Sequence, residues 1–406
     1  MRTKLSANPS FTLLWFARVA SSLSFQMVGV AVGWQIYEIT NSAFDLGLVG
    51  LAQFFPLVLF MLVVGHIVDR YDRRITAAAS QLIGTLAAIV LAGAAATHAS
   101  SSTLIYASVF LIGTSRAFEL PSMQSLVPAV VPLAEMGRGM ARLTVAHKAA
   151  VVAGPAVGGI LYAFGPLVVY VTAAVLYLVA GVFVALLRTQ GAPRAVTPPT
   201  LQSLFAGIDF IRRSPIILGS ISLDLFAVLL GGATALLPIY ARDILVIGPL
   251  GLGILRSAPA IGALAGSFYL SFRPLHRRAG WTMFASVGAF GLATIVFGLS
   301  RSFALSFCAL IVLGAADVVS VVIRLTLVQV RTPDAMRGRV NAVNSLFTGT
   351  SNQLGEFESG VTAAWFGTIP AVVIGGLGTI AVALLWIALF PAIARIDSIE
   401  GGGSAG

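Results

Sequence analysis

The sequence predicts an all-α membrane protein, with twelve transmembrane helices arranged as two parallel six-helix repeats around a central cavity. Three observations support this prediction. The composition is too apolar for a protein surrounded by water, twelve apolar runs are long enough to cross a bilayer, and the second half of the chain repeats the first.

The composition excludes several classes of protein. Of the 406 residues, 58% are hydrophobic and only 10% are charged, whereas a soluble domain carries about 25% charged residues. The net charge of +10 is concentrated between the apolar runs, which indicates membrane topology and not nucleic-acid binding. The single cysteine, Cys308, excludes an intramolecular disulfide, and the four histidines are scattered. We expect no metal and no cofactor, and no enzymatic activity, because no nucleophile–base set is present.

The repeat appears when the chain is shifted along itself by 201 positions. Gly113 then falls on Gly314 (314 − 113 = 201). The same shift pairs Gly65 with Gly266, Pro132 with Pro333, Ala134 with Ala335, Gly137 with Gly338, Arg138 with Arg339, Gly154 with Gly355 and Gly159 with Gly360. We therefore expect two copies of one membrane unit, a design in which many secondary transporters place the substrate between the halves.

The apolar runs predict six spans in each half. A membrane helix needs about 20 mostly apolar residues. The runs centre near Phe25, Pro56, Leu86, Phe110, Val152, Leu176, Leu229, Leu264, Gly288, Leu313, Thr350 and Leu384. The first run is too long for a secretory signal and has no small-residue cleavage site. A soluble helical protein is the alternative that the composition opposes.

The distribution of basic residues predicts that both termini face the cytoplasm. One set of connections contains only Arg242 and Arg301. The other set contains Arg2, Lys4, Arg70, Arg73, Arg74, Arg138, Arg142, Arg188, Arg194, Arg212, Arg213, Arg273, Arg277, Arg278, Arg331, Arg337, Arg339 and Arg395. Connections rich in lysine and arginine stay in the cytoplasm.

These boundaries predict a first half at 1–187, a connection at 188–214 and a second half at 215–396. The tail at 397–406 ends in a glycine-rich stretch from Gly401, which we interpret as a cloning remnant. In the connection, Leu201, Leu204, Phe205, Ile208 and Ile211 recur at helical spacing. This spacing predicts an amphipathic helix along the cytoplasmic membrane face, and a substrate-binding helix is the alternative.

A charged motif stands between the second and third spans: Gly65-His-Ile-Val-Asp69-Arg70-Tyr-Asp72-Arg73-Arg74. Gly65 permits close helix packing, Asp69 is suited to face a helix N-terminus, and the arginines suit the cytoplasm and anionic headgroups. The motif resembles the G-x-x-x-D-R-x-x-R-R loop of the major facilitator superfamily. The resemblance implies a latch that holds the two halves in one conformation. A charge cluster that only sets topology is the alternative, and Leu270 replaces the aspartate in the second repeat.

The fifth span contains Gly154-Pro155-Ala-Val-Gly158-Gly159. Small residues four apart allow two helices to pack closely, and Pro155 frees a backbone carbonyl and permits a bend. This element resembles the G-P-x-x-G-G motif of exporters and antiporters in the same superfamily. A hinge or tight seal is expected, with simple helix packing as the alternative.

The two motifs, together with the segment 332–341 and the segment 29–36, resemble one branch of the superfamily, which contains the bacterial enterobactin exporter. The resemblance covers nearly all of residues 10–395. It implies the major facilitator fold, a monomer in the bacterial inner membrane, and proton-driven efflux of a small molecule.

Charged residues inside spans are candidates for function, because a charge in the membrane is costly unless it meets water or a partner. By the superfamily layout, spans one, four, seven and ten line the cavity. They carry Arg18, Arg116, Glu119, Asp224, Asp317 and Arg324. Arg116 and Glu119 lie three residues apart and can form an internal pair. Arg18 and Arg324 lie near cytoplasmic helix ends, so snorkelling is the alternative for these two.

Span eleven carries a polar stripe of Asn344, Thr348, Asn352 and Glu356 at successive fours. In the repeat, Glu356 stands where Pro155 stands in span five, while Glu358 points about 200° away. The stripe suits a water-filled cavity or a proton route. Pairing of Glu356 with a nearby cation is the structural alternative.

We therefore expect a proton antiporter that exports a small polar or amphipathic molecule, siderophore-like or drug-like, by alternating access. The expected proton-coupling residues are Glu356, Asp224, Glu119 and Asp317. The expected substrate-binding residues are Arg116, Glu119, Asp224, Asp317, Asn344, Asn352, Arg18 and Gln26. A nutrient importer of the same fold and a membrane receptor or scaffold that transports nothing are the alternatives.

Overall fold

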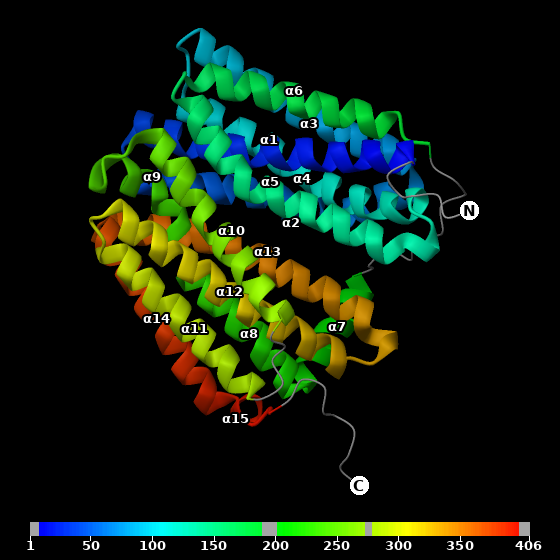
Figure 1. Ribbon diagram of the computed structural model, residues 1–406, viewed down its shortest axis with the longest axis vertical. Helices are drawn as coiled ribbons and strands as arrows, with labels where there is room; N and C mark the ends of the chain where they lie inside the picture. Colours follow the sequence, from blue (N-terminus) through cyan, green and yellow to red (C-terminus); the bar gives the residue numbers. More distant parts are fainter. Residues whose placement is uncertain (1–7, 189–200, 273–277, 398–406) are drawn as a thin grey trace. The chain divides into compact units, whose positions relative to one another are not determined.

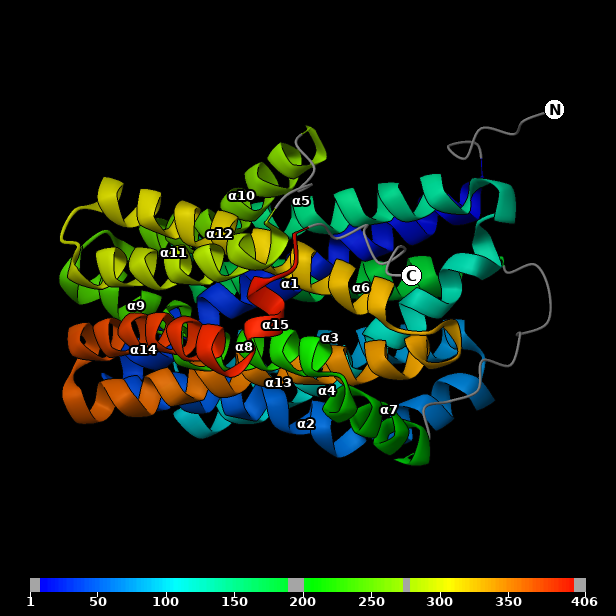
Figure 2. The same ribbon diagram turned by 90° about the horizontal axis from the view of Figure 1, so that it is seen from below.

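The structure, a computed structural model, describes residues 8–188, 201–272 and 278–397, and within its helices it leaves aside the side chains of 61, 62, 69 and 201–204. Throughout these residues the ordered elements are helices, without a strand (Figure 1, Figure 2). The predicted all-α class is confirmed. Five of the arginines and lysines used to predict topology, at 2, 4, 194, 273 and 277, lie outside the described residues.

The helices follow one another with short connections. The first half contains α1 (Pro9–Thr40), α2 (Ala43–Arg70), α3 (Arg73–Ala96), α4 (Ser102–Val130), α5 (Met136–Tyr162) and α6 (Pro166–Ala185). Then come α7 (Leu201–Arg213), α8 (Pro215–Leu230), the short α9 (Leu237–Ile239), α10 (Gly248–Phe272), α11 (Ala279–Leu299), α12 (Phe303–Arg331), α13 (Asp334–Phe366), α14 (Thr368–Leu389) and the short α15 (Pro391–Ala394).

Ten helical stretches in the described residues are long and apolar enough to cross a membrane. One of them, Pro215–Ile244, joins α8, α9 and the short turns around them into a single broken span. The other two predicted spans correspond to α4 and α13, which have 29 and 33 residues. They are long enough to cross, but they carry the polar and charged side chains considered below.

Local sequence explains where several helices begin and end. Asn8 caps α1 by accepting hydrogen bonds from the amides of Ser10 and Phe11, and Pro9 occupies the first turn, where its missing N–H has no cost. Asn41 ends α1 in the left-handed conformation, with φ 50°. Asp72 caps α3 and Ser101 caps α4 in the same way as Asn8. The connection between α2 and α3 is therefore fixed by an N-cap.

Contacts divide the chain into two units. Unit 1 comprises Met1–Asn41, Leu51–Pro198 and Ile247–Ser257, and unit 2 comprises Ser42–Gly50, Pro199–Val246 and Ala258–Gly406. The main division falls in the predicted connection at 188–214. Two short segments differ from the predicted halves, because the start of α2 groups with the second half and the start of α10 groups with the first.

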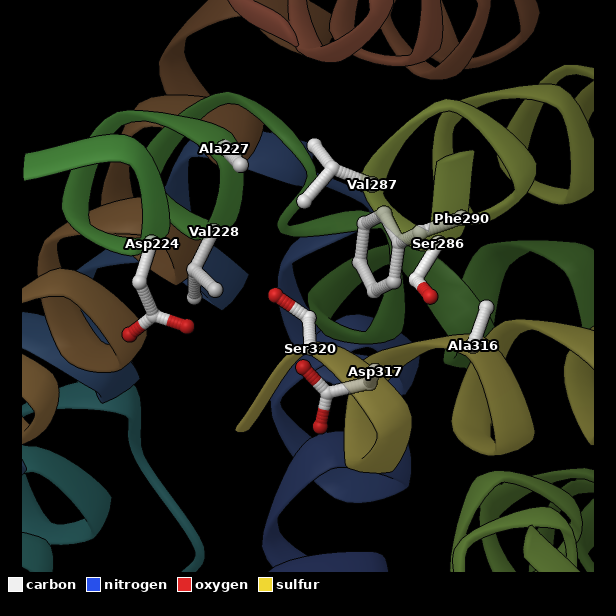
Figure 3. Close-up of a pocket in the computed structure, with 9 residues that line it drawn as sticks. All are labelled: Asp224, Ala227, Val228, Ser286, Val287, Phe290, Ala316, Asp317 and Ser320. Carbon is white, nitrogen blue, oxygen red and sulfur yellow. The ribbon is translucent and has the colours of Figure 1, made fainter. Parts of the chain in front are cut away.

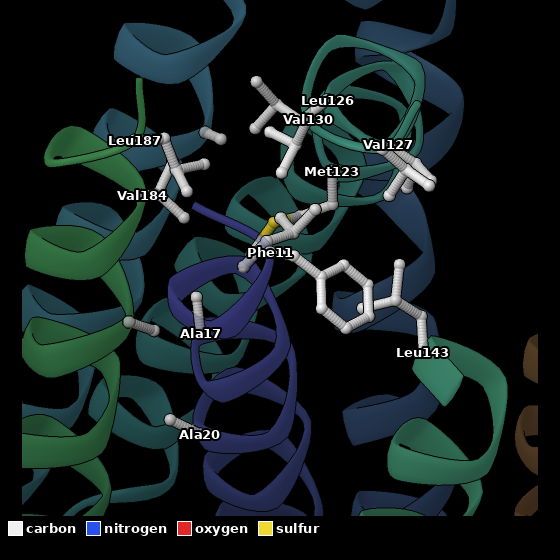
Figure 4. Packing of buried hydrophobic residues seen from close by; sticks show 14 residues of the cluster. Phe11, Ala17, Ala20, Met123, Leu126, Val127, Val130, Leu143, Val184 and Leu187 are labelled. Atoms are coloured by element: carbon white, nitrogen blue, oxygen red, sulfur yellow. The ribbon is translucent and has the colours of Figure 1, made fainter. Parts of the chain in front are cut away.

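In unit 1, α1 packs along α5 and α6, and α3 packs along α4 and α6 (Figure 1). A buried apolar cluster joins one end of five of these helices: Phe11 and Ala17 come from α1, Ala77 from α3, Met123 from α4, Leu143 from α5 and Val184 from α6 (Figure 4). Close packing of these side chains fixes the helices that carry Arg18 and Arg116.

In unit 2, α11 packs along α12 and α14, and α8 packs along α13 and α14. The buried cluster of this unit includes Leu223 of α8, Met283 of α11, Ile323 of α12 and Trp386 of α14. Helix α7 packs against α13 within the same unit, where a Cβ on Gly207 would lie 3.0 Å from the carbonyl oxygen of Arg339. The amphipathic helix thus has a protein partner: Ile211 is buried, while Phe205 remains 66% exposed.

Glycines mark close helix approaches in each unit. In unit 1, Gly158 faces Met27 of α1, and a Cβ on Gly159 would lie 3.0 Å from the Cα of Gly253 in α10. In unit 2, a Cβ on Gly360 of α13 would lie 2.6 Å from the Cα of Gly47 in α2. Gly159 and Gly360 are repeat mates under the shift of 201. Each repeat therefore uses the same glycine to pack a helix backbone against a neighbour.

Candidate functional site

In unit 1, α4 carries a buried ion pair. Arg116 Nη1 lies 2.9 Å from Glu119 Oε2, one helical turn away. The Arg116 side chain is 17% exposed and that of Glu119 only 2%. Ser21 of α1 donates a hydrogen bond to the other carboxylate oxygen of Glu119. The carboxylate is thus held from two helices, as a buried charge requires.

Side chains of α1 and α5 surround this pair. The guanidinium of Arg116 stacks on the ring of Phe25, 4.3 Å from its centroid. Arg18 is half-buried and close enough to interact electrostatically with both Glu119 and Arg116. Gln26 points elsewhere, since its amide reaches the carbonyl of Val151 at 3.4 Å on α5. Arg18 therefore joins the Arg116 cluster, and Gln26 belongs to the contact between α1 and α5.

In unit 2, a second buried ion pair joins two helices. Arg324 Nη2 of α12 lies 3.0 Å from Asp224 Oδ2 of α8, and the two side chains are 2% and 7% exposed. Arg324 Nη1 also donates to Asn344 at 2.6 Å and to Thr348 at 3.5 Å, both on α13. Snorkelling of Arg324 to the cytoplasm is therefore wrong, because its guanidinium ties three helices together inside unit 2.

A pocket lies beside this ion pair. Its volume is about 10 Å³, roughly the space that one water molecule needs. Asp224 and Asp317 stand at its two sides, with Ser320 between them, and Phe290 of α11 also lines it (Figure 3). The structure thus brings together the two predicted acids of spans seven and ten. Under the shift of 201, Asp317 is the repeat mate of Arg116.

The polar stripe of α13 divides into two parts. Asn344 and Thr348 bind Arg324, while Asn352 is exposed and donates to the backbone carbonyl of Thr348 at 2.8 Å. Glu356 is half-buried and lies against the start of α2. A Cβ on Gly50 of α2 would lie 2.9 Å from the Cβ of Glu356. The stripe is therefore not one continuous polar surface. Glu358 is also half-buried and accepts a hydrogen bond from Thr362 at 2.7 Å.

The predicted latch motif occupies the end of α2 and the start of α3. The side chain of Asp69 lies outside the described residues, Gly65 is half-buried and Arg70 is exposed. Arg73 donates to the carbonyl of Ser125 at 3.3 Å, and Arg74 to that of Leu187 at 2.9 Å. The two arginines thus bind the ends of α4 and α6 within unit 1, where the sequence predicted contact with headgroups.

Asp72 has a role that the sequence analysis missed. Its carboxylate caps α3 through the amide of Arg74 at 2.9 Å and pairs with the Arg74 guanidinium at 2.6 Å. These hydrogen bonds from Arg74 hold the pKa of Asp72 below its ordinary value. The signal was present in the sequence, because an aspartate directly before a helical run is a capping pattern.

The G-P-x-x-G-G element packs closely on both sides. A Cβ on Gly154 would meet Gln26 and one on Gly158 would meet Met27, both on α1. Gly159 faces Pro249 and Gly253 of α10. Pro155 lies inside α5, which runs on to Tyr162, and its carbonyl faces Gly253. The glycines are therefore explained by packing, and the hinge role of Pro155 stays a prediction.

His147 of α5 is a further polar residue that the sequence analysis did not use. Its Nδ1 lies 2.9 Å from the hydroxyl oxygen of Ser22 on α1. It is half-buried and close enough to interact electrostatically with Arg18, Arg116 and Glu119. Within the described residues, no group of three or more histidine, cysteine, aspartate or glutamate side chains is placed to hold a metal ion.

The helices of the two units follow the major facilitator fold, and solved structures of that fold superpose on this chain. The nucleoside transporter NupG superposes with a TM-score of 0.70 at 17% identity, covering 93% of this chain and 99% of that one. A bacterial homologue of the human lysosomal transporter Spinster superposes with a TM-score of 0.73 at 14% identity, covering 95% and 96%. These structural similarities establish the fold of the chain and not its substrate.

The sequence places the chain more narrowly. It belongs to the transmembrane secretion effector family of the major facilitator superfamily, whose profile matches residues 5–400. It is 27% identical over 398 residues to the enterobactin exporter EntS of Citrobacter koseri, covering 96% of this chain and 94% of that protein. EntS of Escherichia coli is similar to the same extent. The predicted superfamily and branch are confirmed, and the protein is a multi-pass membrane transporter.

Proposed function

We propose that this protein exports a small polar or amphipathic molecule across the bacterial inner membrane, driven by protons that move in the opposite direction. The observation that carries the proposal is the pair of carboxyls at one pocket, Asp224 and Asp317. A carboxyl pair inside a membrane protein is chemistry that binds and releases a proton. The relatives named as exporters support the direction of transport.

In this mechanism, binding of a proton changes which side chains hold Arg324. When Asp224 is charged, it holds α8 to α12 through Arg324. Proton uptake by Asp224 removes the charge that Arg324 balances, so the guanidinium is left with Asn344 and Thr348 of α13. Asp317 lies on the same helix as Arg324 and across the pocket from Asp224, which makes it the partner for sharing a proton. Protonation thereby biases the packing of α8, α12 and α13 and so the balance between conformations.

Unit 1 contributes an ion pair to this scheme, and unit 2 contributes two carboxyls at one pocket. Arg116 and Glu119 in unit 1 form the site at which substrate competes for the guanidinium, while Asp224 and Asp317 in unit 2 carry the proton. Glu356 is a second candidate for the proton, because it is a half-buried carboxyl on α13.

The experiment begins with a substrate chosen by thermal stabilisation of the purified protein against a panel of iron-chelating and drug-like molecules. Its uptake is then measured in inverted and right-side-out membrane vesicles. We expect proton-driven accumulation in inverted vesicles alone, abolished by a protonophore. Accumulation only in right-side-out vesicles would identify an importer, and binding without flux in either would identify a receptor.

The proton site is tested with matched variants. Asp317→Asn and Asp224→Asn should lose proton-driven accumulation while substrate exchange survives, whereas Asp334→Asn, at an acid that is 87% exposed at the start of α13, should behave as wild type. Loss of accumulation in Glu356→Gln with retention in both pocket variants would move the proton site to Glu356.

A further inference from the structure

Three basic side chains from three helices of unit 1 converge around one buried acid. Arg18 comes from α1, Arg116 from α4 and His147 from α5, and all three are half-buried. They lie close enough to one another to interact electrostatically. The fixed geometry comes from Glu119, which holds Arg116 at 2.9 Å, and from Ser22, which holds His147 Nδ1 at 2.9 Å.

The cluster has more positive than negative charge. Glu119 is the acid that interacts with Arg18, Arg116 and His147, and it balances one of the two guanidinium groups. Lys148, which is exposed on α5, adds to the positive potential at His147. The acid is buried at 2% exposure while Arg116 is 17% exposed. The cluster therefore carries a net positive charge, and its cations are more exposed than its acid.

The depth of the cluster limits what can neutralise it. Arg116 is 14 residues from either end of α4 (Ser102–Val130), which corresponds to about 21 Å of helix rise on each side. His147 is likewise in the middle of α5 (Met136–Tyr162). A lipid headgroup at the bilayer surface does not reach this depth. Charges in the middle of a membrane protein face either a partner or a watery path for a ligand.

We propose that unit 1 contains a binding site for the anionic group of a small organic molecule, formed by Arg18, Arg116 and His147. Two guanidinium groups are suited to donate paired hydrogen bonds to a carboxylate or a similar anion. When the Ser22 hydroxyl donates to His147 Nδ1, the proton of the ring is on Nε2, which becomes a third donor. Phe25, stacked on Arg116, keeps that guanidinium in place. The inference rests on the proposed function and names the chemistry of its substrate.

Glu119 acts here as a positioning residue. It holds Arg116 from the buried side, with Ser21 of α1 donating to its other oxygen. An anion of the substrate and Glu119 therefore share Arg116, while Arg18 is available to balance the added negative charge. A cationic ligand would meet two guanidinium groups at the same place, which is unfavourable at any of these distances.

The test measures binding to the detergent-purified full chain, with benzoate as the probe and benzamide as its uncharged counterpart of the same shape. We expect benzoate to bind and benzamide not to bind, in calorimetry and in thermal stabilisation. Arg18→Gln and His147→Gln should each weaken benzoate about tenfold or more, as the loss of a hydrogen bond to a charged group does. Arg142→Gln, at an exposed arginine of the same helix as His147, is the matched control and should bind as wild type.

Arg116 needs a gentler change, because its removal leaves Glu119 without the guanidinium with which it forms an ion pair. Arg116→Lys keeps the charge but loses the paired geometry, so benzoate should bind more weakly while circular dichroism and elution volume stay unchanged. Equal binding of benzoate and benzamide by the wild type, or equal loss in Arg142→Gln and in Arg18→Gln, would overturn the proposal. So would an absence of benzoate binding.

Two further arms separate the possible sources of an anion and the two proposals. In nanodiscs, benzoate affinity should be the same with and without phosphatidylglycerol, whereas displacement by this anionic lipid would assign the cluster to a headgroup and overturn the proposal. Benzoate binding without proton-driven flux would leave the anion site standing and remove the proposed antiport. Proton-driven flux without benzoate binding would support the proposed antiport and overturn the anion site.

Discussion

Arg324 of α12 and Asp224 of α8 form an ion pair at 3.0 Å in which both side chains are almost completely buried. Removal of one partner of such a pair lowers the stability of the fold, because the other charge is left unbalanced in a medium of low dielectric. Asn344 of α13 shares the guanidinium at 2.6 Å, so the consequences extend over three helices of unit 2.

The first prediction concerns this pair. Asp224→Leu and Arg324→Met alone should each destabilise the purified protein by about 3–5 kcal/mol, since each leaves one buried charge uncompensated. The double variant should regain much of the loss, because two apolar side chains replace the two charges. Thermal unfolding in detergent measures all three. Strictly additive losses would mean that the two residues do not interact.

A second prediction uses the unequal burial of Arg116 and Glu119. Arg116→Ala leaves a carboxylate that is 2% exposed, whereas Glu119→Ala leaves a guanidinium that is 17% exposed and stacked on Phe25. We therefore expect the arginine variant to lose more thermal stability, and the double variant to recover part of that loss. A larger loss of thermal stability in Glu119→Ala than in Arg116→Ala would contradict the arrangement described for α4.

Much of the fold could be predicted from the sequence because its signals are local. Helix positions follow from apolar runs, and the Arg116–Glu119 pair follows from a spacing of three on one helix. The Asp224–Arg324 pair could not be predicted in this way, since its partners are 100 positions apart on separate helices. The same holds for Ser22 and His147, which are separated by 125 positions.

The polar stripe of α13 shows which features of a site can be predicted from helical periodicity. A spacing of four correctly places Asn344 and Thr348 on one face, where Arg324 binds both. Periodicity does not say which neighbour each residue meets, and Glu356 packs at Gly50 of α2 instead. The amphipathic pattern of α7 was similarly incomplete, because its period does not distinguish a membrane surface from a partner helix such as α13.

The third prediction tests the glycine contact in unit 2. Gly360→Ala should destabilise the protein by about 1–3 kcal/mol, since the new methyl group would lie 2.6 Å from the Cα of Gly47 and the backbones must separate. Gly338→Ala on the same helix is the control, because a Cβ there has open space around it, and alanine favours a helix over glycine by up to about 1 kcal/mol. Equal effects of the two changes on the melting temperature would argue against the close contact.

The fourth prediction is a pH dependence at Asp72. Its pKa is lowered in the folded protein by hydrogen bonds from Arg74, so the stabilisation is present above the ordinary pKa of 3.8 and is lost as the pH falls through the lower folded value. Asp72→Ala should cost about 1 kcal/mol near neutral pH, as the loss of an N-cap does. The difference from wild type should shrink below about pH 4.

The control for Asp72 is another capping residue without a charge. Ser101 caps α4 through the amide of Leu104 at 3.3 Å, and its hydroxyl does not titrate in this range. The deficit of Ser101→Ala should therefore stay constant over the same pH range. A constant deficit in Asp72→Ala as well would show that the carboxylate charge contributes nothing to the cap.

The coupling of substrate movement to protons is tested most directly in liposomes that contain the purified protein, a trapped substrate from the stabilisation screen and a pH-sensitive dye. No ion gradient is imposed, so the substrate gradient alone drives flux. As substrate leaves, antiport predicts that protons enter and the lumen becomes acidic, and that Asp317→Asn loses this acidification. Substrate efflux through the wild type with no change in lumenal pH would contradict proton antiport, and a rise in lumenal pH would show that protons move together with the substrate.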